Sequence, residues 1–161
     1  MLLYHGSNMV VENPEIRTPN RNLDFGVGFY TTSSIAQAVS FSRIVCSRRG
    51  GNPVISVYDF DDEAAKDLSA IKIFPQADEE WLDFVCDKRM GKYRGQEYDI
   101  IIGPVANDTI YRTLIGYLAG VTSKEETLKR LMARELQDQI TLSTDKALAF
   151  LTFTHFKEVD L

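Results

Sequence analysis

The sequence predicts an α+β fold in which short strands form a split sheet with helices around it. Runs of β-branched, aromatic and aliphatic residues outnumber the helical segments, and the two kinds do not alternate regularly along the chain. The chain has 161 residues, of which 44% are hydrophobic and 25% charged, enough to bury one core and too few for two. We therefore expect a single domain over residues 1–161.

One stretch organises the prediction, residues 24–42, DFGVGFYTTSSIAQAVSFS. Its two glycines permit positive φ and close backbone approach, and the aromatic and β-branched residues 29–32 then form a short strand. Ser34 is followed three residues later by Gln37, the S-x-x-Q form of a capping box. The spacing predicts a helix from Ile35 towards Arg48.

The rest of the chain supplies the other strands and helices. The expected strands are residues 2–5, 54–60, 71–74, 98–105, 139–143 and 151–159, of which 98–105 is apolar enough to be a central strand covered on both faces. The expected helices are 78–91, with Trp81, Leu82, Val85, Cys86 and Met90 as its buried stripe, then 108–119, 124–135 behind the capping box Ser123 and Glu126, and a turn at 145–150. Residues 8–22 contain prolines and asparagines and are expected to form a surface loop.

Charge and cysteine content limit the function classes. The net charge of −5 argues against a general nucleic-acid coat, whereas residues 1–53 carry five arginines against three acidic residues, which suits a phosphate-bearing ligand. Cys46 and Cys86 lie in expected helices among apolar neighbours, which favours reduced thiols over a disulfide or a zinc site, and we expect no metal. No run approaches a membrane span and no basic leader precedes an apolar run, so we expect a cytoplasmic protein.

Two short matches in the central stretch carry no chemistry. Asp24-Phe25-Gly26 imitates a kinase magnesium motif, but the chain is short and has no His-Arg-Asp loop. Gly26-x-Gly28 is a fragment of a dinucleotide-binding loop that lacks its third glycine.

A longer comparison covers two separated motifs. LYHGS at residues 3–7, followed by FGVGFYTT and a helix rich in small residues, resembles the NAD-binding core of the poly- and mono-ADP-ribosyltransferase superfamily, in the same order. The resemblance implies an NAD cleft between two small sheets. It also implies that His5, Tyr30 and Gln139, on three separate strands, are the motif residues.

The resemblance implies a role for each matching residue. His5 would hydrogen-bond a ribose hydroxyl, Gly6 would hold the nicotinamide amide through its backbone, and Ser7 belongs to the same binding motif. Tyr30 would stack on the cationic nicotinamide ring, with Phe41 as a second aromatic face. The alternatives are a structural histidine at a strand end and two aromatic rings in the core. Ala38 occupies the position of the family's amide-binding serine, so other residues would have to supply that hydrogen bond to the nicotinamide amide.

The third motif departs from the family, because Gln139 stands where a glutamate would bind the ribose. Alternation places Ile140 and Leu142 on one face and Gln139 on the other, directed at the cleft. An amide can hold a hydroxyl but offers no full negative charge to an oxocarbenium, so polymer elongation is disfavoured. The alternative is a surface glutamine on an edge strand.

Further candidates follow from charge and position. Asn107 and Asp108 come after the central strand, and Asp108 would supply the missing carboxylate, unless both residues are simply helix caps. Arg21, together with Arg17, lies in the loop after His5 and could meet the pyrophosphate.

The sequence therefore predicts an enzyme that uses NAD as a substrate. It would cleave the nicotinamide glycosidic bond and pass ADP-ribose to a protein or nucleic-acid acceptor, as a toxin or a regulatory modifier, with an antitoxin-like protein as a possible partner and no membrane contact. The alternative is a catalytically inactive module that binds NAD or a protein in the same cleft. A third hypothesis is RNA phosphate removal, as in the NAD-dependent phosphotransferase branch, but the basic residues that this branch needs around its motifs are not evident in the sequence.

Overall fold

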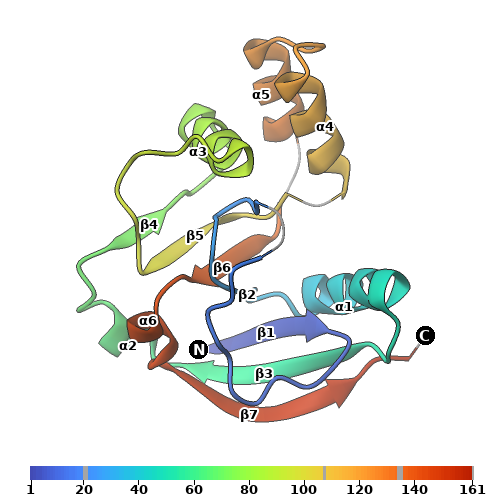
Figure 1. The fold of residues 1–161 in the computed structure, drawn as a ribbon, viewed down its shortest axis with the longest axis vertical. Coiled ribbons are helices and arrows are strands. Elements are labelled where there is room, and N and C mark those ends of the chain that lie inside the picture. Colours follow the sequence, from blue (N-terminus) through green and yellow to red (C-terminus); the bar gives the residue numbers. More distant parts are fainter. Residues whose placement is uncertain (20–21, 107, 134–135, 161) are drawn as a thin grey trace.

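Two separate sheets form the centre of the protein (Figure 1), in a computed structural model that describes residues 1–19, 22–106, 108–133 and 136–160. The three-stranded sheet has the antiparallel order β1 (Leu2–Ser7), β3 (Val54–Phe60) and β7 (Leu151–Glu158). The four-stranded sheet has the order β2 (Phe29–Thr31), β6 (Asp138–Leu142), β5 (Ile100–Pro104) and β4 (Ile71–Ile73), with β4 parallel to β5. The predicted α+β class and central position of β5 are confirmed.

Helices lie on the outer faces of both sheets. Helix α1 (Ile35–Arg49) packs on β1 and β3, whereas α3 (Glu79–Met90), α4 (Asp108–Leu118) and α5 (Lys124–Met132) lie beyond the four-stranded sheet, with α4 and α5 as a hairpin (Figure 1). Two short helices, α2 (Asp62–Ala65) and α6 (Asp145–Leu148), lie together on one side of the sheets. Helix α6 lies where the sequence predicts a turn at 145–150, whereas α2, a single turn capped by Asp61, has no predicted counterpart.

Three apolar clusters match this layering. One lies between the sheets and includes Leu3, Phe29, Tyr58, Ile140 and Leu142. A second joins the four-stranded sheet to α3, α4 and α5, and includes Phe25, Trp81, Phe84, Ile101 and Leu114. A third, smaller one lies under α1. Each face of the four-stranded sheet is therefore covered, which explains its nearly continuous apolar central strand.

Local signals place the helix starts as predicted. The side chains of the predicted N-caps accept backbone N–H groups, Ser34 from Gln37, Asp78 from Trp81 and Ser123 from Glu126. Gly26 has φ of 83°, which confirms that the turn before β2 needs a glycine.

One expectation about burial is wrong. Met90, predicted in the buried stripe of α3, is 42% exposed, because it lies in the last turn beside the exposed Gly91, while Phe84 is buried instead. Periodicity alone does not say how wide a helix face its neighbours will cover.

Candidate functional site

The two N-terminal motifs meet where the sheets come together. Tyr4 and Thr32 form an isolated antiparallel bridge with N–H to carbonyl distances of 2.9 and 3.0 Å. One residue further along β1, the Nδ1 atom of His5 lies 2.8 Å from the carbonyl oxygen of Tyr30, and the imidazole stacks on Phe29 at 4.5 Å between ring centroids. Three hydrogen bonds thus join residues that are 25 positions apart (His5 and Tyr30) or 28 positions apart (Tyr4 and Thr32) in the sequence.

The hydrogen bond determines which nitrogen of His5 can serve a ligand. A carbonyl oxygen can only accept, so Nδ1 carries the proton and the Nε2 atom of the neutral ring is an acceptor. Burial lowers the pKa of His5, although the Tyr30 carbonyl partly opposes that shift by stabilising the protonated ring. A neutral imidazole with an Nε2 acceptor can receive a hydrogen bond from a hydroxyl group.

Gly6 allows β1 to lie directly against α1. A Cβ at this position would be 2.1 Å from the carbonyl oxygen of Ala38 and 2.9 Å from the amide nitrogen of Ser42. Ser7 is the last residue of β1, opposite Val54, and is partly buried. The glycine of the first motif therefore also allows close packing of β1 on α1, a role that the sequence pattern did not indicate.

Tyr30 is anchored to the glycine turn. Its hydroxyl donates to the carbonyl of Gly26 at 2.6 Å and accepts the N–H of Phe25 at 3.2 Å, while its ring packs against the core below α3. Burial raises the pKa of Tyr30, so the phenol stays protonated. An ion pair between Asp24 and Arg89 joins the residue before this turn to α3.

Phe41 lies on α1 and is 44% exposed. The alternative interpretation of Phe41 as a core aromatic is therefore wrong. Its ring faces solvent, where a ligand can reach it.

Gln139 is buried and lies on an internal strand. Strand β6 runs between β2 and β5, Gln139 pairs with Gly103, and the residue is 9% exposed. The alternative of a surface glutamine on an edge strand is wrong. Among the residues that the structure describes, the Nε2 atom of Gln139 has no hydrogen-bond partner, and the same holds for the hydroxyls of Thr141 and Ser143 two and four residues further on. Such atoms cost free energy in a folded chain unless something binds them.

Strand geometry separates the three motif side chains. Thr141 lies opposite Tyr30, so Tyr30, Thr141 and Gln139 share the face of the sheet towards α3. His5 contacts Phe29, whose ring belongs to the cluster between the sheets. His5 and Tyr30 therefore lie on opposite faces of β2 and are linked through the Tyr30 carbonyl.

Comparison with known proteins places the chain in a family. Residues 1–153 match the model of a family described as "Protein of unknown function (DUF3990)". The chain belongs to this DUF3990 family. No curated protein and no solved structure matches it.

In this DUF3990 chain, a carboxylate that the sequence analysis missed lies beside Gln139. Asp138 accepts hydrogen bonds from the Thr32 hydroxyl at 2.9 Å, the Ser33 N–H at 3.0 Å and the Ser33 hydroxyl at 2.6 Å. It thereby joins β6 to the turn that follows β2. Its place in Q-D-Q was the available signal, but only the fold shows that its partners lie at the end of the second motif and directly after it.

The remaining predicted residues are less well placed. Arg21 and Asn107 lie outside the described residues. Asp108 begins α4, and its side chain also lies outside what the structure describes. Arg17 forms an exposed ion pair with Glu15 at 3.1 Å.

Metal-binding clusters and membrane-spanning helices are both absent from the described part of the chain. No cluster of three or more histidine, cysteine, aspartate or glutamate side chains there is arranged to hold a metal ion. None of its helices combines the length and apolar character that a membrane crossing requires. Both cysteines are free thiols.

Proposed function

We propose that this protein is an NAD-dependent mono-ADP-ribosyltransferase, which cleaves the bond between nicotinamide and ribose and passes ADP-ribose to a macromolecular acceptor. The observation that carries the proposal is the direct hydrogen bond from His5 to the Tyr30 carbonyl at the junction of the two sheets. It supports the resemblance of the two motifs to halves of one NAD-binding core, since they are remote in sequence and adjacent in space.

The proposed roles follow from the hydrogen-bonding capacity of each group. The Nε2 atom of neutral His5 accepts a hydroxyl of the nicotinamide ribose. The ring of Tyr30, the expected stacking partner of nicotinamide, packs against the core instead, so the exposed ring of Phe41 is the aromatic face that remains for the cationic nicotinamide. The unsatisfied amide of Gln139 lies on the other face of the sheet from His5, so it would hold a different ligand hydroxyl from the one that His5 accepts.

In the proposed reaction, nicotinamide is the leaving group and takes both electrons of the bond that breaks. The C1′–N bond breaks with both electrons passing to nicotinamide, which leaves neutral, and an oxocarbenium-like ribose remains. An acceptor nucleophile then bonds to C1′ and loses a proton. Gln139 supplies no negative charge to the oxocarbenium, so transfer should be slower than with a glutamate at this position. If Asp108 is the missing carboxylate, its removal should abolish the reaction.

The test is nicotinamide release from NAD with cell lysate as the source of acceptor, beside calorimetric titration of NAD. Wild type should release nicotinamide, Gln139→Ala should slow release, and Gln139→Glu should accelerate it. Gln76→Glu, at an exposed position, adds the same charge elsewhere and should change nothing. Absence of NAD binding to folded wild-type protein would refute the proposal.

A second candidate is a non-catalytic module that binds NAD on the same fold. The residue that favours it is Gln139 itself, because an amide at the carboxylate position removes charge stabilisation while keeping a hydrogen-bonding group. This module would bind NAD in calorimetry and release no nicotinamide above background in wild type or Gln139→Ala.

A further inference from the structure

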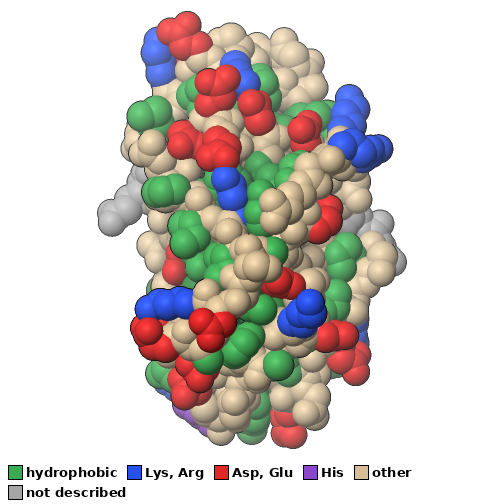
Figure 2. All heavy atoms as spheres, turned by 90° about the vertical axis from the view of Figure 1, so that its left-hand side faces the viewer, with side chains coloured by type: hydrophobic (Ala, Val, Ile, Leu, Met, Phe, Trp, Pro, Cys, Tyr) green, Lys and Arg blue, Asp and Glu red, His purple; other side chains and the backbone are tan. Residues whose placement is uncertain are grey.

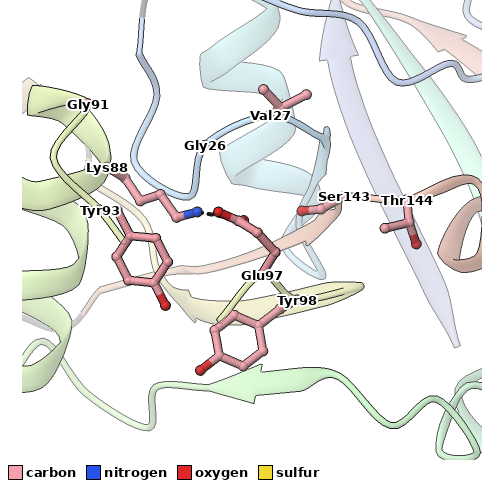
Figure 3. A pocket seen from close by; sticks show the side chains of 9 residues that line it. All are labelled: Gly26, Val27, Lys88, Gly91, Tyr93, Glu97, Tyr98, Ser143 and Thr144. Atoms are coloured by element: carbon pink, nitrogen blue, oxygen red, sulfur yellow. Dashed lines mark hydrogen bonds and ion pairs between the residues drawn. The ribbon is translucent and has the colours of Figure 1, made fainter. Parts of the chain in front are cut away.

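A second candidate site lies just beyond the end of β6, beside Ser143, the last of the three unsatisfied polar side chains Gln139, Thr141 and Ser143. A cavity of about 410 Å³ opens beside the glycine turn and is lined by residues that include Val27, Lys88, Tyr93, Glu97, Tyr98 and Ser143 (Figure 3). Its volume is within the range of small-ligand pockets. Ser143 lies four residues from Gln139 along the chain, roughly 13 Å at the rise of a strand, so this cavity is separate from the surroundings of Gln139, although Gly26 and Val27 of the second motif also line it.

Lys88 places a positive charge inside this cavity. Its side chain is 9% exposed, its ammonium lies 4.1 Å from the ring centroid of Tyr93, and it pairs with Glu97 at 2.8 Å. Glu97 is 77% exposed, so its carboxylate is a solvent-facing counter-ion for a buried cation. An anionic group of a ligand can therefore replace the Glu97 carboxylate beside Lys88 without leaving another buried charge unpaired.

The other walls offer stacking and one polar contact. Figure 3 shows the rings of Tyr93 and Tyr98 on one side of the cavity and the hydroxyls of Ser143 and Thr144 on the other. Thr144 donates to Asp99 at 2.7 Å, whereas the buried hydroxyl of Ser143 has no partner among the described residues. The site therefore combines aromatic faces, a cation and an unsatisfied hydroxyl.

Further basic residues lie next in sequence to those that line the cavity, in a chain that is acidic overall. Residues 88–94, KRMGKYR, carry four basic side chains, of which Arg89 pairs with Asp24 while Lys92 and Arg94 are exposed. The loop after α3 lies on the side of the molecule shown in Figure 2, where basic and hydrophobic side chains stand between acidic groups. Aromatic platforms interleaved with basic residues are the means by which proteins bind single-stranded nucleic acids.

We propose that this cavity binds one nucleotide of a single-stranded nucleic acid, with the base on the tyrosine rings and a phosphate at Lys88 in place of Glu97. Lys92 and Arg94 meet the neighbouring phosphates. Nucleotide binding here is independent of NAD chemistry. The further step, that this strand is the ADP-ribose acceptor, rests on the proposed transferase function.

Fluorescence anisotropy of a labelled oligothymidylate of about twelve nucleotides at low salt tests the proposal, because such binding has a strong electrostatic component. Wild type should bind it. Lys88→Met keeps the aliphatic stem and should weaken binding about tenfold or more, with a shallower salt dependence. Glu97→Gln should tighten binding several-fold, because it releases Lys88 to the phosphate.

The matched control is Lys66→Met, which removes a lysine that also pairs with a glutamate, Glu63, but lies on α2. It should bind like wild type. Thermal unfolding checks each variant, and the exposed Glu97→Gln decides the matter if Lys88→Met does not fold. The proposal is overturned if wild type does not bind, if Lys88→Met and Lys66→Met behave alike, or if Glu97→Gln weakens binding. Equal affinity for free thymidine monophosphate would also overturn it in favour of a free nucleotide. Because no NAD is present, failure here leaves the transferase proposal untouched.

Discussion

The Nδ1 atom of His5 donates to the carbonyl oxygen of Tyr30 across the junction of the two sheets, over 2.8 Å. A side chain of the first motif thus donates a hydrogen bond to the main chain of the second motif. Because the donor must be Nδ1–H, the bond holds His5 in one neutral tautomer and directs its other nitrogen elsewhere. Both the stability of the domain and its proposed chemistry depend on this proton.

The pH dependence of stability should report His5. Since burial lowers its pKa, the native state resists a proton that the unfolded chain accepts near pH 6.5. The stabilisation from neutral His5 is fully present above about pH 6.5 and is lost as the pH falls towards the lowered native pKa. His5→Gln should therefore show a smaller drop in Tm on acidification, measured by circular dichroism. His155→Gln, at an exposed position, should retain the wild-type drop, and an identical drop in all three proteins would contradict the assignment.

Tyr30→Phe should destabilise the fold although the ring remains. The substitution leaves the Gly26 carbonyl and the Phe25 N–H without their hydroxyl partner, which should lower the free energy of unfolding by about 1–3 kcal/mol. Urea titration measures the change. Tyr111→Phe, at a position 39% exposed, is the control and should cost less than about 0.5 kcal/mol. Equal stabilities of the two variants would show that the Tyr30 hydroxyl does not hold the turn.

Gly6→Ala should disrupt the contact of β1 with α1. The added methyl group would meet a main-chain carbonyl at 2.1 Å, which cannot move away as a flexible side chain would. We expect a loss of at least about 2 kcal/mol in the free energy of unfolding, from overpacking. Ser7→Ala, the next residue on the strand, should be nearly neutral by the same urea titration. A soluble Gly6→Ala protein with wild-type stability would mean that α1 shifts away without cost.

Gln139→Leu should separate stability from function. Removing a buried amide that has an unsatisfied nitrogen should leave the free energy of unfolding unchanged or raise it by about 1 kcal/mol. Thr141→Val tests the same effect two residues away, where the hydroxyl is buried and equally unsatisfied. If Gln139 serves a ligand, Gln139→Leu should lose NAD binding or nicotinamide release while Thr141→Val keeps them. A large loss of stability in Gln139→Leu would instead assign the glutamine to the core.

The sequence alone determined most of the secondary structure and the two motifs. Ser34 and Gln37 predict the start of α1, and the β-rich run 54–60 coincides with β3, because caps and strand propensity depend on neighbouring residues. Alternation likewise placed Ile140 and Leu142 in the core. These signals are local, and the fold does not override them.

Only the tertiary structure decided which residues meet. The order of strands makes β6 internal, and this buries Gln139, which sequence reasoning left equally open to a surface role. It also sets His5 and Tyr30 on opposite faces of β2, ties Asp138 to Ser33 and encloses Lys88 between Glu97 and Tyr93. The pattern along one strand says which residues share a face, but the identity of the element that covers that face depends on chain segments far away in sequence.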